Sequence, residues 1–186
     1  DESVLYIENF ANFIGKRIVA HNSSDPKIVA QVLQSVQPNI DHNRYNVFTW
    51  TLFDFVNPEG YVVAASSLGV IDKPVMVEKE RRSWMVTSKE NPWDAQFSKK
   101  DVGIISNESI IPIGFGIVGY NHKFLGYISM GINVKRITQT LKSVVSDKIM
   151  KFAVLDKDFD VVLSSDGFDE IGAVKSNLLK YKDSKK

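Results

Sequence analysis

The chain of 186 residues has no cysteine, which excludes disulfides, thiolate nucleophiles and cysteine-ligated zinc. It also lacks an excess of charge: 23 Lys and Arg against 22 Asp and Glu give a net charge of +1, so nothing in the electrostatics favours a nucleic-acid partner. No run reaches the roughly 18 apolar residues of a membrane span. Because the chain opens in what looks like the middle of a helix, without Met, we expect a domain cut from a larger protein.

Catalytic and metal-binding motifs are missing as well, so we expect neither an enzyme nor a bound cofactor. The three histidines are far apart, and none has a partner at the HExxH spacing. Residues 156–160 alternate aspartates like a calcium loop, but Val161 and Gly167 replace the Gly and Glu that such a loop needs. Residues 114–119 have the G-x-G-x-x-G spacing inside an apolar strand, with no helix after it. Those glycines favour a thinned sheet that another group approaches closely.

Two helices are predicted at the N-terminal end. Residues 1–20 carry apolar side chains at spacings of three and four, which is typical of a helix with one apolar face. Asp25 as N-cap and Pro26 as first helical residue then predict a second helix over about 27–36. We expect this helix to end before Pro38.

Two antiparallel hairpins follow. Residues 46–67 are two β-rich runs joined by the turn sequence Asn-Pro-Glu-Gly at 57–60. Residues 104–132 predict a second pair of strands, with a turn at 121–123. The segment between them, 68–103, is irregular, although 75–84 could carry a helix. A loop of this length inside a compact domain usually has a function.

The C-terminal part predicts an amphipathic helix over 133–147 and a further hairpin over 151–165. That hairpin repeats the chemistry of the first one, either because both obey the same turn rules or because it is a truncated second module. We expect a sensor-like domain over 1–147. Residues 148–186 would be an additional hairpin and tail packed on the same domain.

Arginine and tryptophan in the irregular segment are the first candidates for ligand binding: Arg82 and Trp84, with Arg81 and Trp93. The planar fork of arginine suits a carboxylate, and the flat apolar face of tryptophan tolerates an organic body. The alternative is a surface cation pair and a tryptophan that anchors the loop to the core.

Asp54 is the only carboxylate within the first predicted strand, on its apolar face. A charge among apolar neighbours must be paired or lie at a rim, so Asp54 either holds a ligand amine or pairs with a cation of the loop. Tyr120 and Ser66 are hydrogen-bonding candidates around the same sheet.

The order of these segments resembles the Cache domains, extracytoplasmic PAS-like sensors of bacterial histidine kinases, chemoreceptors and cyclic-dinucleotide enzymes. The sequence FDFVNPEGYVVAASS at 53–67 is similar to the strand, turn, strand and terminal serine of that family. VEKERRSWMV at 77–86 resembles its pocket-lining Arg-x-Trp helix, and 109–134 resembles its last strand pair. The likeness covers about residues 1–145. One departure is that residues 113–116 read Ile-Gly-Phe-Gly where the family often has an Asp that meets the ligand amine.

The resemblance implies an α+β, PAS-like fold: a central five-stranded antiparallel sheet with a long N-terminal helix behind it, plus the extra C-terminal hairpin. It implies a periplasmic small-ligand sensor of an inner-membrane signalling protein, a sensor histidine kinase first among the parents. The ligand would be a small organic molecule of anionic class, held by Arg82, and the chain would form a homodimer through the N-terminal helix. The alternative is a ligand-free PAS-type module that dimerises through Val4, Ile7, Phe10 and Ile14.

Overall fold

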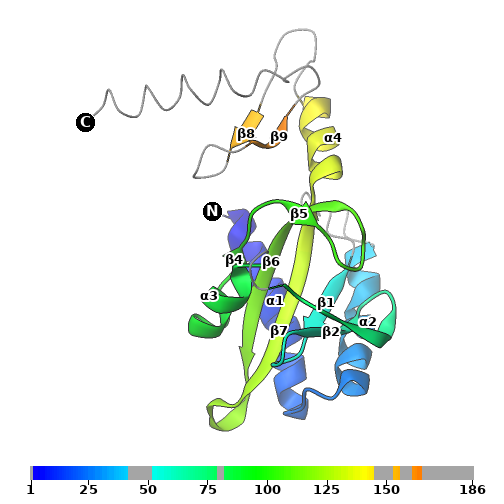
Figure 1. Cartoon of the computed structure of the whole chain (residues 1–186), viewed down its shortest axis with the longest axis vertical. Coiled ribbons are helices and arrows are strands. Elements are labelled where there is room, and N and C mark those ends of the chain that lie inside the picture. Colours follow the sequence, from blue (N-terminus) through cyan, green and yellow to red (C-terminus); the bar gives the residue numbers. More distant parts are fainter. Residues whose placement is uncertain (1, 42–51, 79–81, 145–152, 156–160, 165–186) are drawn as a thin grey trace, which may run out of the picture. The chain divides into compact units, whose positions relative to one another are not determined.

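The computed structural model describes residues 2–41, 52–78, 82–144, 153–155 and 161–164 (Figure 1). The chain divides into two compact units, Asp1–Asn133 and Val134–Lys186. The predicted domain boundary at residue 147, and the packing of 148–186 on the same domain, stay predictions.

The first unit is an α+β fold around an antiparallel sheet. Its strand order is β3-β2-β1-β7-β6-β4, with β5 also pairing with β6. β4 and β5 have two residues each, so five longer strands form the body of the sheet and the predicted fold class is confirmed. The strands are β1 (Phe53–Val56), β2 (Tyr61–Ala65), β3 (Gly69–Met76), β4 (Gln96–Phe97), β5 (Asp101–Val102), β6 (Ser109–Val118) and β7 (Phe124–Asn133).

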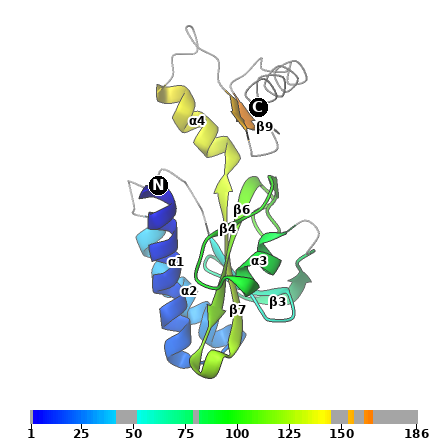
Figure 2. The same ribbon diagram turned by 90° about the vertical axis from the view of Figure 1, so that its left-hand side faces the viewer.

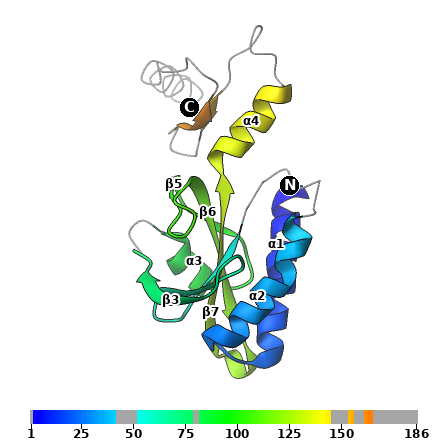
Figure 3. The same cartoon turned by 90° about the vertical axis from the view of Figure 1, so that its right-hand side faces the viewer.

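Helices cover both faces of this sheet. α1 (Glu2–His21) and α2 (Pro26–Asp41) lie side by side on one face, and the short α3 (Trp84–Glu90) lies on the other (Figures 2 and 3). The long helix behind the sheet is therefore confirmed, and a second helix accompanies it.

The start of α2 is as predicted, but its end is not. Asp25 caps the helix, since its Oδ1 accepts from the backbone N of Lys27 at 2.8 Å. The expected stop before Pro38 is wrong, because α2 continues to Asp41. A proline has a backbone φ that a helix accepts, and it removes one hydrogen bond rather than the whole ladder.

The apolar face of α1 is buried against the sheet. Ile7 and Ile14 are 1% and 0% exposed, and Phe10 packs on Phe53 with ring centroids 5.3 Å apart. A side chain buried in this way cannot form a dimer contact. The interface predicted for the ligand-free module is therefore wrong at Ile7 and Ile14, while the side chain of Val4 lies outside the described residues.

The first hairpin is confirmed in detail. The backbone N of Gly60 donates to Asn57 O at 2.9 Å, and the backbone N of Tyr61 donates to Asn57 Oδ1 at 2.8 Å. Gly60 has a φ of +98°, a conformation that glycine adopts without steric cost. Residues 46–51 of the predicted hairpin lie outside the described residues.

The irregular segment contains a strand that the sequence pattern did not indicate. β3 is an edge strand with mostly exposed side chains, so it has no alternation of apolar and polar residues to read. The helix considered over 75–84 is wrong: residues 75 and 76 end β3, and α3 begins only at Trp84. Likewise, 104–108 is a turn region and the second hairpin begins at Ser109.

The glycines of β6 let α3 approach the sheet, as expected from the sequence. A Cβ at Gly114 would overlap the ring of Trp84, and a Cβ at Gly116 would overlap the carbonyl of Ser88. The space above these residues is occupied by α3 (Figure 2). The glycine spacing thus serves packing between a helix and a sheet.

Replacing Gly114 with Ala is expected to destabilise the first unit by about 3 kcal/mol, because the added methyl overlaps a fully buried ring. Urea unfolding followed by circular dichroism measures this. In a Trp84→Ala background the same substitution should cost much less, since the ring that it meets is gone. Equal costs in the two backgrounds would contradict this packing.

The second unit contains α4 (Val134–Val144) and an antiparallel pair, β8 (Ala153–Leu155) and β9 (Val161–Ser164). The helix predicted over 133–147 and the strands of the hairpin over 151–165 are present as far as the structure describes them. Among the helices of the described residues, none combines the length and the apolarity required to cross a bilayer.

Candidate functional site

Arg82 lies just before α3 and is only 5% exposed. Its Nη1 pairs with Asp101 Oδ2, and its Nη2 donates to the carbonyl of Val102 at 2.6 Å. Both partners belong to β5. The guanidinium group therefore fastens the segment before α3 to β5, and its charge has a carboxylate partner inside the protein.

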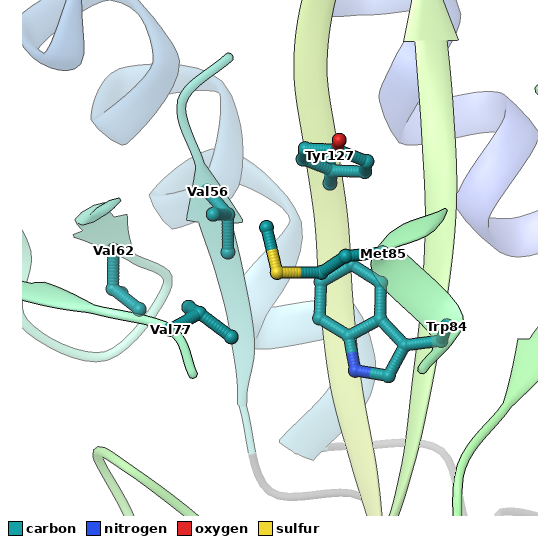
Figure 4. Packing of buried hydrophobic residues seen from close by; sticks show 6 residues of the cluster. All are labelled: Val56, Val62, Val77, Trp84, Met85 and Tyr127. Carbon is teal, nitrogen blue, oxygen red and sulfur yellow. The ribbon is translucent and has the colours of Figure 1, made fainter. Parts of the chain in front are cut away.

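Trp84 begins α3 and is 1% exposed. Its ring packs edge-on against Tyr127, with centroids 5.6 Å apart, and lies over the sheet beside Met85 (Figure 4). Its backbone N donates to Ser98 Oγ at 3.0 Å. The indole Nε1, by contrast, is buried without a hydrogen-bond partner.

Asp54 stands in the middle of the sheet, on β1, opposite Ser129 of β7 and Ala65 of β2. Its Oδ1 is buried and has no hydrogen-bond partner. Burial raises the pKa of the Asp54 carboxyl to about 7, because a desolvated carboxylate is costly. Among the described residues, no group of three His, Asp or Glu side chains could hold a metal ion.

These three residues line one cavity above the sheet. Its volume is about 30 Å³, roughly the space of one or two water molecules. Asp54, Arg82 and Trp84 belong to a lining that is otherwise largely apolar. That lining includes Val56, Val62, Val77, Ile110, Pro112 and Met130.

Residues 103–106, here called the cap, lie between β5 and β6 and line the cavity. Two backbone bonds shape the cap: the N of Gly103 donates to Glu108 O at 2.8 Å, and the N of Asn107 donates to Gly103 O at 2.9 Å. A second hollow of about 280 Å³ lies against the same segment and shares Arg82, Gly103 and Ile104 with the cavity.

Sequence reasoning missed both the cap and Asp101. It assigned residues 104–120 to strands because of their apolar content. The signal that could have located the turn is the Ser106-Asn107 pair, since serine and asparagine favour turns and Asn107 has a φ of +52°. Asp101 carried no signal, because its role depends on the pairing of β5 with β6.

Three predicted site residues lie elsewhere. Trp93 packs against α1, where a Cβ at Gly15 would come within 2.6 Å of its ring, so it anchors the chain after α3. Ser66 Oγ accepts from the backbone N of Phe53 at 2.9 Å within the sheet, and Tyr120 is 59% exposed at the tip of the second hairpin. None of these three residues lines this cavity, and their role in ligand binding stays a prediction.

The remaining candidate, Arg81, lies outside the described residues. The structure therefore brings together Arg82, Trp84 and Asp54 from the predicted set. These come from two segments far apart in the sequence, and the hairpin pairing of β6 with β7 brings them to one face.

No family model and no curated protein matches the chain. Solved structures do match. They include the ligand-binding domain of the Pseudomonas fluorescens chemoreceptor CtaA with L-serine (TM-score 0.60, 13% identity, 86% of this chain and 63% of that one). They also include the ligand-binding domain of the Campylobacter jejuni chemoreceptor Tlp3 with 4-methylisoleucine (TM-score 0.59, 13% identity, 87% of this chain and 62% of that one). A third is the ligand-binding domain of the Pseudomonas aeruginosa amino-acid chemoreceptor PctC with GABA (TM-score 0.60, 13% identity, 85% of this chain and 67% of that one).

The chain spans about 62–63% of the length of the CtaA and Tlp3 domains. At these identities the likeness establishes the fold, which is the Cache-type fold expected from the sequence.

Proposed function

We propose that the chain is the small-ligand-sensing part of a membrane-bound signal-transduction protein, on the extracytoplasmic side of the membrane. The observation that carries the proposal is the cavity lined by Asp54 and Trp84, two residues that each have a buried polar atom without a partner, Oδ1 and Nε1. Buried polar groups are nearly always hydrogen-bonded, because an unpaired one costs about 1–3 kcal/mol. A bound molecule that pairs with both groups accounts for their retention.

The structural neighbours support the class of function. CtaA, Tlp3 and PctC are chemoreceptors whose ligand-binding domains were solved with small organic molecules. A sensing role is consistent with the same fold and with a cavity on its sheet. The finer interpretation, a sensor histidine kinase of the inner membrane with this part in the periplasm, rests on the sequence resemblance, and a chemoreceptor parent fits the neighbours equally well.

A route for the signal follows from the chain path. Asn133 is the last residue of β7, it lines the cavity, and its Nδ2 donates to Glu108 Oε2 at 2.6 Å. The next residue, Val134, is the first of α4. A ligand that moves the cap or the end of β7 therefore acts on the residue preceding α4. It can shift the population only by its difference in affinity for the two states.

Homodimerisation through α1 belongs to this proposal as well. Ile7 and Ile14 are used by the core, so the contact needs the outer side of the helix. Phe13 is 48% exposed there, with the guanidinium of Arg17 5.7 Å from its ring centre. This exposed pair is the starting point for a test of the dimer.

Thermal-shift screening with organic acids, amines and amino acids tests the sensing function. A ligand at 100 times its Kd should stabilise the first unit by about 2.7 kcal/mol, which raises Tm by several degrees. Arg82→Ala should abolish most of this ligand-induced shift, because Arg82 lines the cavity. The matched control is Lys73→Ala, which removes a cation from an exposed position of β3 and should keep the full shift.

The shift is compared within each variant, since Arg82→Ala also removes contacts to β5 and lowers Tm without ligand. Absence of a response to every compound, together with concentration-dependent dimerisation, would contradict the sensing function. That result would favour the ligand-free module.

A further inference from the structure

The polar residues that line the cavity differ in whether their polar atoms already have a partner within the protein. The Arg82 guanidinium is paired with Asp101 and with the carbonyl of Val102. The two buried groups without a partner are an acceptor, Asp54 Oδ1, and a donor, Trp84 Nε1. A ligand is therefore recognised most directly through the carboxyl group and the indole N–H.

The acceptor favours a cationic group. Asp54 is surrounded mostly by apolar side chains, and Arg82 is the only other charged residue among the described residues that line the cavity. A buried carboxylate is stabilised by an opposite charge that also donates hydrogen bonds. Because Arg82 is already paired, the compensating charge has to come with the ligand.

The donor favours a neutral oxygen on the same ligand. An ammonium group has no lone pair and cannot accept from Trp84 Nε1, so a second atom of the ligand must do so. A carboxylate oxygen is disfavoured, because it would share a cavity of about 30 Å³ with Asp54 and like charges in one site repel. A hydroxyl or an amide carbonyl meets the requirement without that repulsion.

We propose that the cavity takes a short organic cation that also bears a neutral oxygen, with the ammonium group donating to Asp54 Oδ1 and the oxygen accepting from Trp84 Nε1. The inference rests on the proposed sensing function and names its ligand class. Short amino alcohols and amino-acid amides are the simplest members. Because they exceed the volume of the cavity, the cap of residues 103–106 moves outward when they bind, toward the neighbouring hollow.

Titration calorimetry of the whole chain tests this class with ethanolamine and glycinamide as probes. Ethylamine keeps the cation and lacks the oxygen, whereas glycine adds a carboxylate and propionate lacks the cation. The two probes should bind at least tenfold more tightly than each of these three compounds, in keeping with the value of a hydrogen bond to a buried group.

Asp54→Asn should weaken binding of both probes by about 10- to 100-fold, since the charge-assisted bond is lost. Asp72→Asn removes the same charge from an exposed position of β3 and should leave the affinity unchanged. The two variants differ in one respect only, the place of the carboxylate.

Proton release by the unaltered protein gives a second readout that needs no variant. At pH 6 the Asp54 carboxyl carries a proton, because its pKa is about 7, and a cation binds the ionised form. Binding should then release about 0.9 proton, measured from the heats in buffers of different ionisation enthalpy. Affinity should fall nearly tenfold for each pH unit below 6.

Tight binding of propionate or glycine that Asp54→Asn does not change would overturn the inference and leave the sensing function standing. Binding of the probes that Asp54→Asn does not weaken would overturn it too. If no compound of the panel binds, the inference fails, and the sensing function is then judged by the broader thermal-shift screen alone.

Discussion

Asp54→Asn is expected to remove most of the pH dependence of stability of the first unit between pH 4 and pH 7. The carboxyl has a pKa of about 7 in the folded chain, against 3.8 for an ordinary aspartate. Below pH 4 it is protonated in both states and costs nothing. As the pH rises toward 7, the unfolded chain ionises while the folded chain keeps its proton, so unfolding becomes more favourable. Above pH 7 both states are ionised and the loss is constant.

The expected size of this loss is large for one side chain. A shift of about three pKa units corresponds to about 4 kcal/mol, at 1.36 kcal/mol per unit. The asparagine side chain of the variant has no ionisation to penalise, although its amide also needs hydrogen bonds, which offsets part of the gain. The variant should therefore be more stable than the parent chain at pH 8 and show a nearly flat profile.

Urea unfolding at several pH values, followed by tryptophan fluorescence, measures these profiles. All 3 tryptophans of the chain precede residue 134, so the signal reports the first unit. Asp72→Asn, exposed on β3, should retain the slope of the parent chain. Parallel profiles for the parent and Asp54→Asn would show that Asp54 titrates normally, and would remove one support for a cation at this site.

The parts of the fold that were predictable are those encoded locally. The turn at 57–60 contains the residue types that its backbone requires, and Asp25 with Pro26 fixes the start of α2. The glycines at 114 and 116 correctly indicated a close approach to the sheet. The resemblance to a sensor family came from the order of such local signals, and the solved structures agree with it in fold.

The parts that could not be predicted depend on contacts between distant segments. Trp93 and Ser66 have side chains that suit a ligand pocket. In the fold, however, Trp93 packs against α1, and Ser66 Oγ accepts a hydrogen bond from the backbone N of Phe53. Asp54 could be recognised because a carboxylate within an apolar strand is conspicuous wherever it folds. The sequence left two roles for Asp54, holding a ligand amine or pairing with a cation of the loop. Arg82 does not fill the second role, because its guanidinium group pairs with Asp101.

Asp101→Ala is expected to destabilise the first unit by about 3 kcal/mol. Arg82 and Asp101 side chains are 6% and 15% exposed, so the substitution leaves a buried guanidinium with the Val102 carbonyl and no carboxylate opposite it. Removing one partner of a buried pair typically costs about 3–5 kcal/mol. The value should lie at the lower end, because Asp101 lies near the surface and water can approach the exposed site.

The charge left behind, not the lost contact, is the cause to be tested. Replacing both residues, Arg82→Met with Asp101→Ala, should restore much of the stability, since an apolar side chain of similar length needs no partner. Asp94→Ala, at an exposed position after α3, controls for removal of a negative charge and should cost less than about 0.5 kcal/mol. If Asp101→Ala costs no more than Asp94→Ala, the pair does not fasten β5.

The same variant connects stability with the cap. β5 ends immediately before residues 103–106, so loss of its anchor should loosen that segment before the rest of the sheet unfolds. Hydrogen exchange at the amide of Gly103, which donates to Glu108 O, should accelerate more than exchange at the paired amides of β6 and β7. Uniform acceleration across the sheet would show that the Arg82–Asp101 pair stabilises the whole fold and not the cap in particular. Movement of the cap would then not be the route by which a ligand enters the cavity.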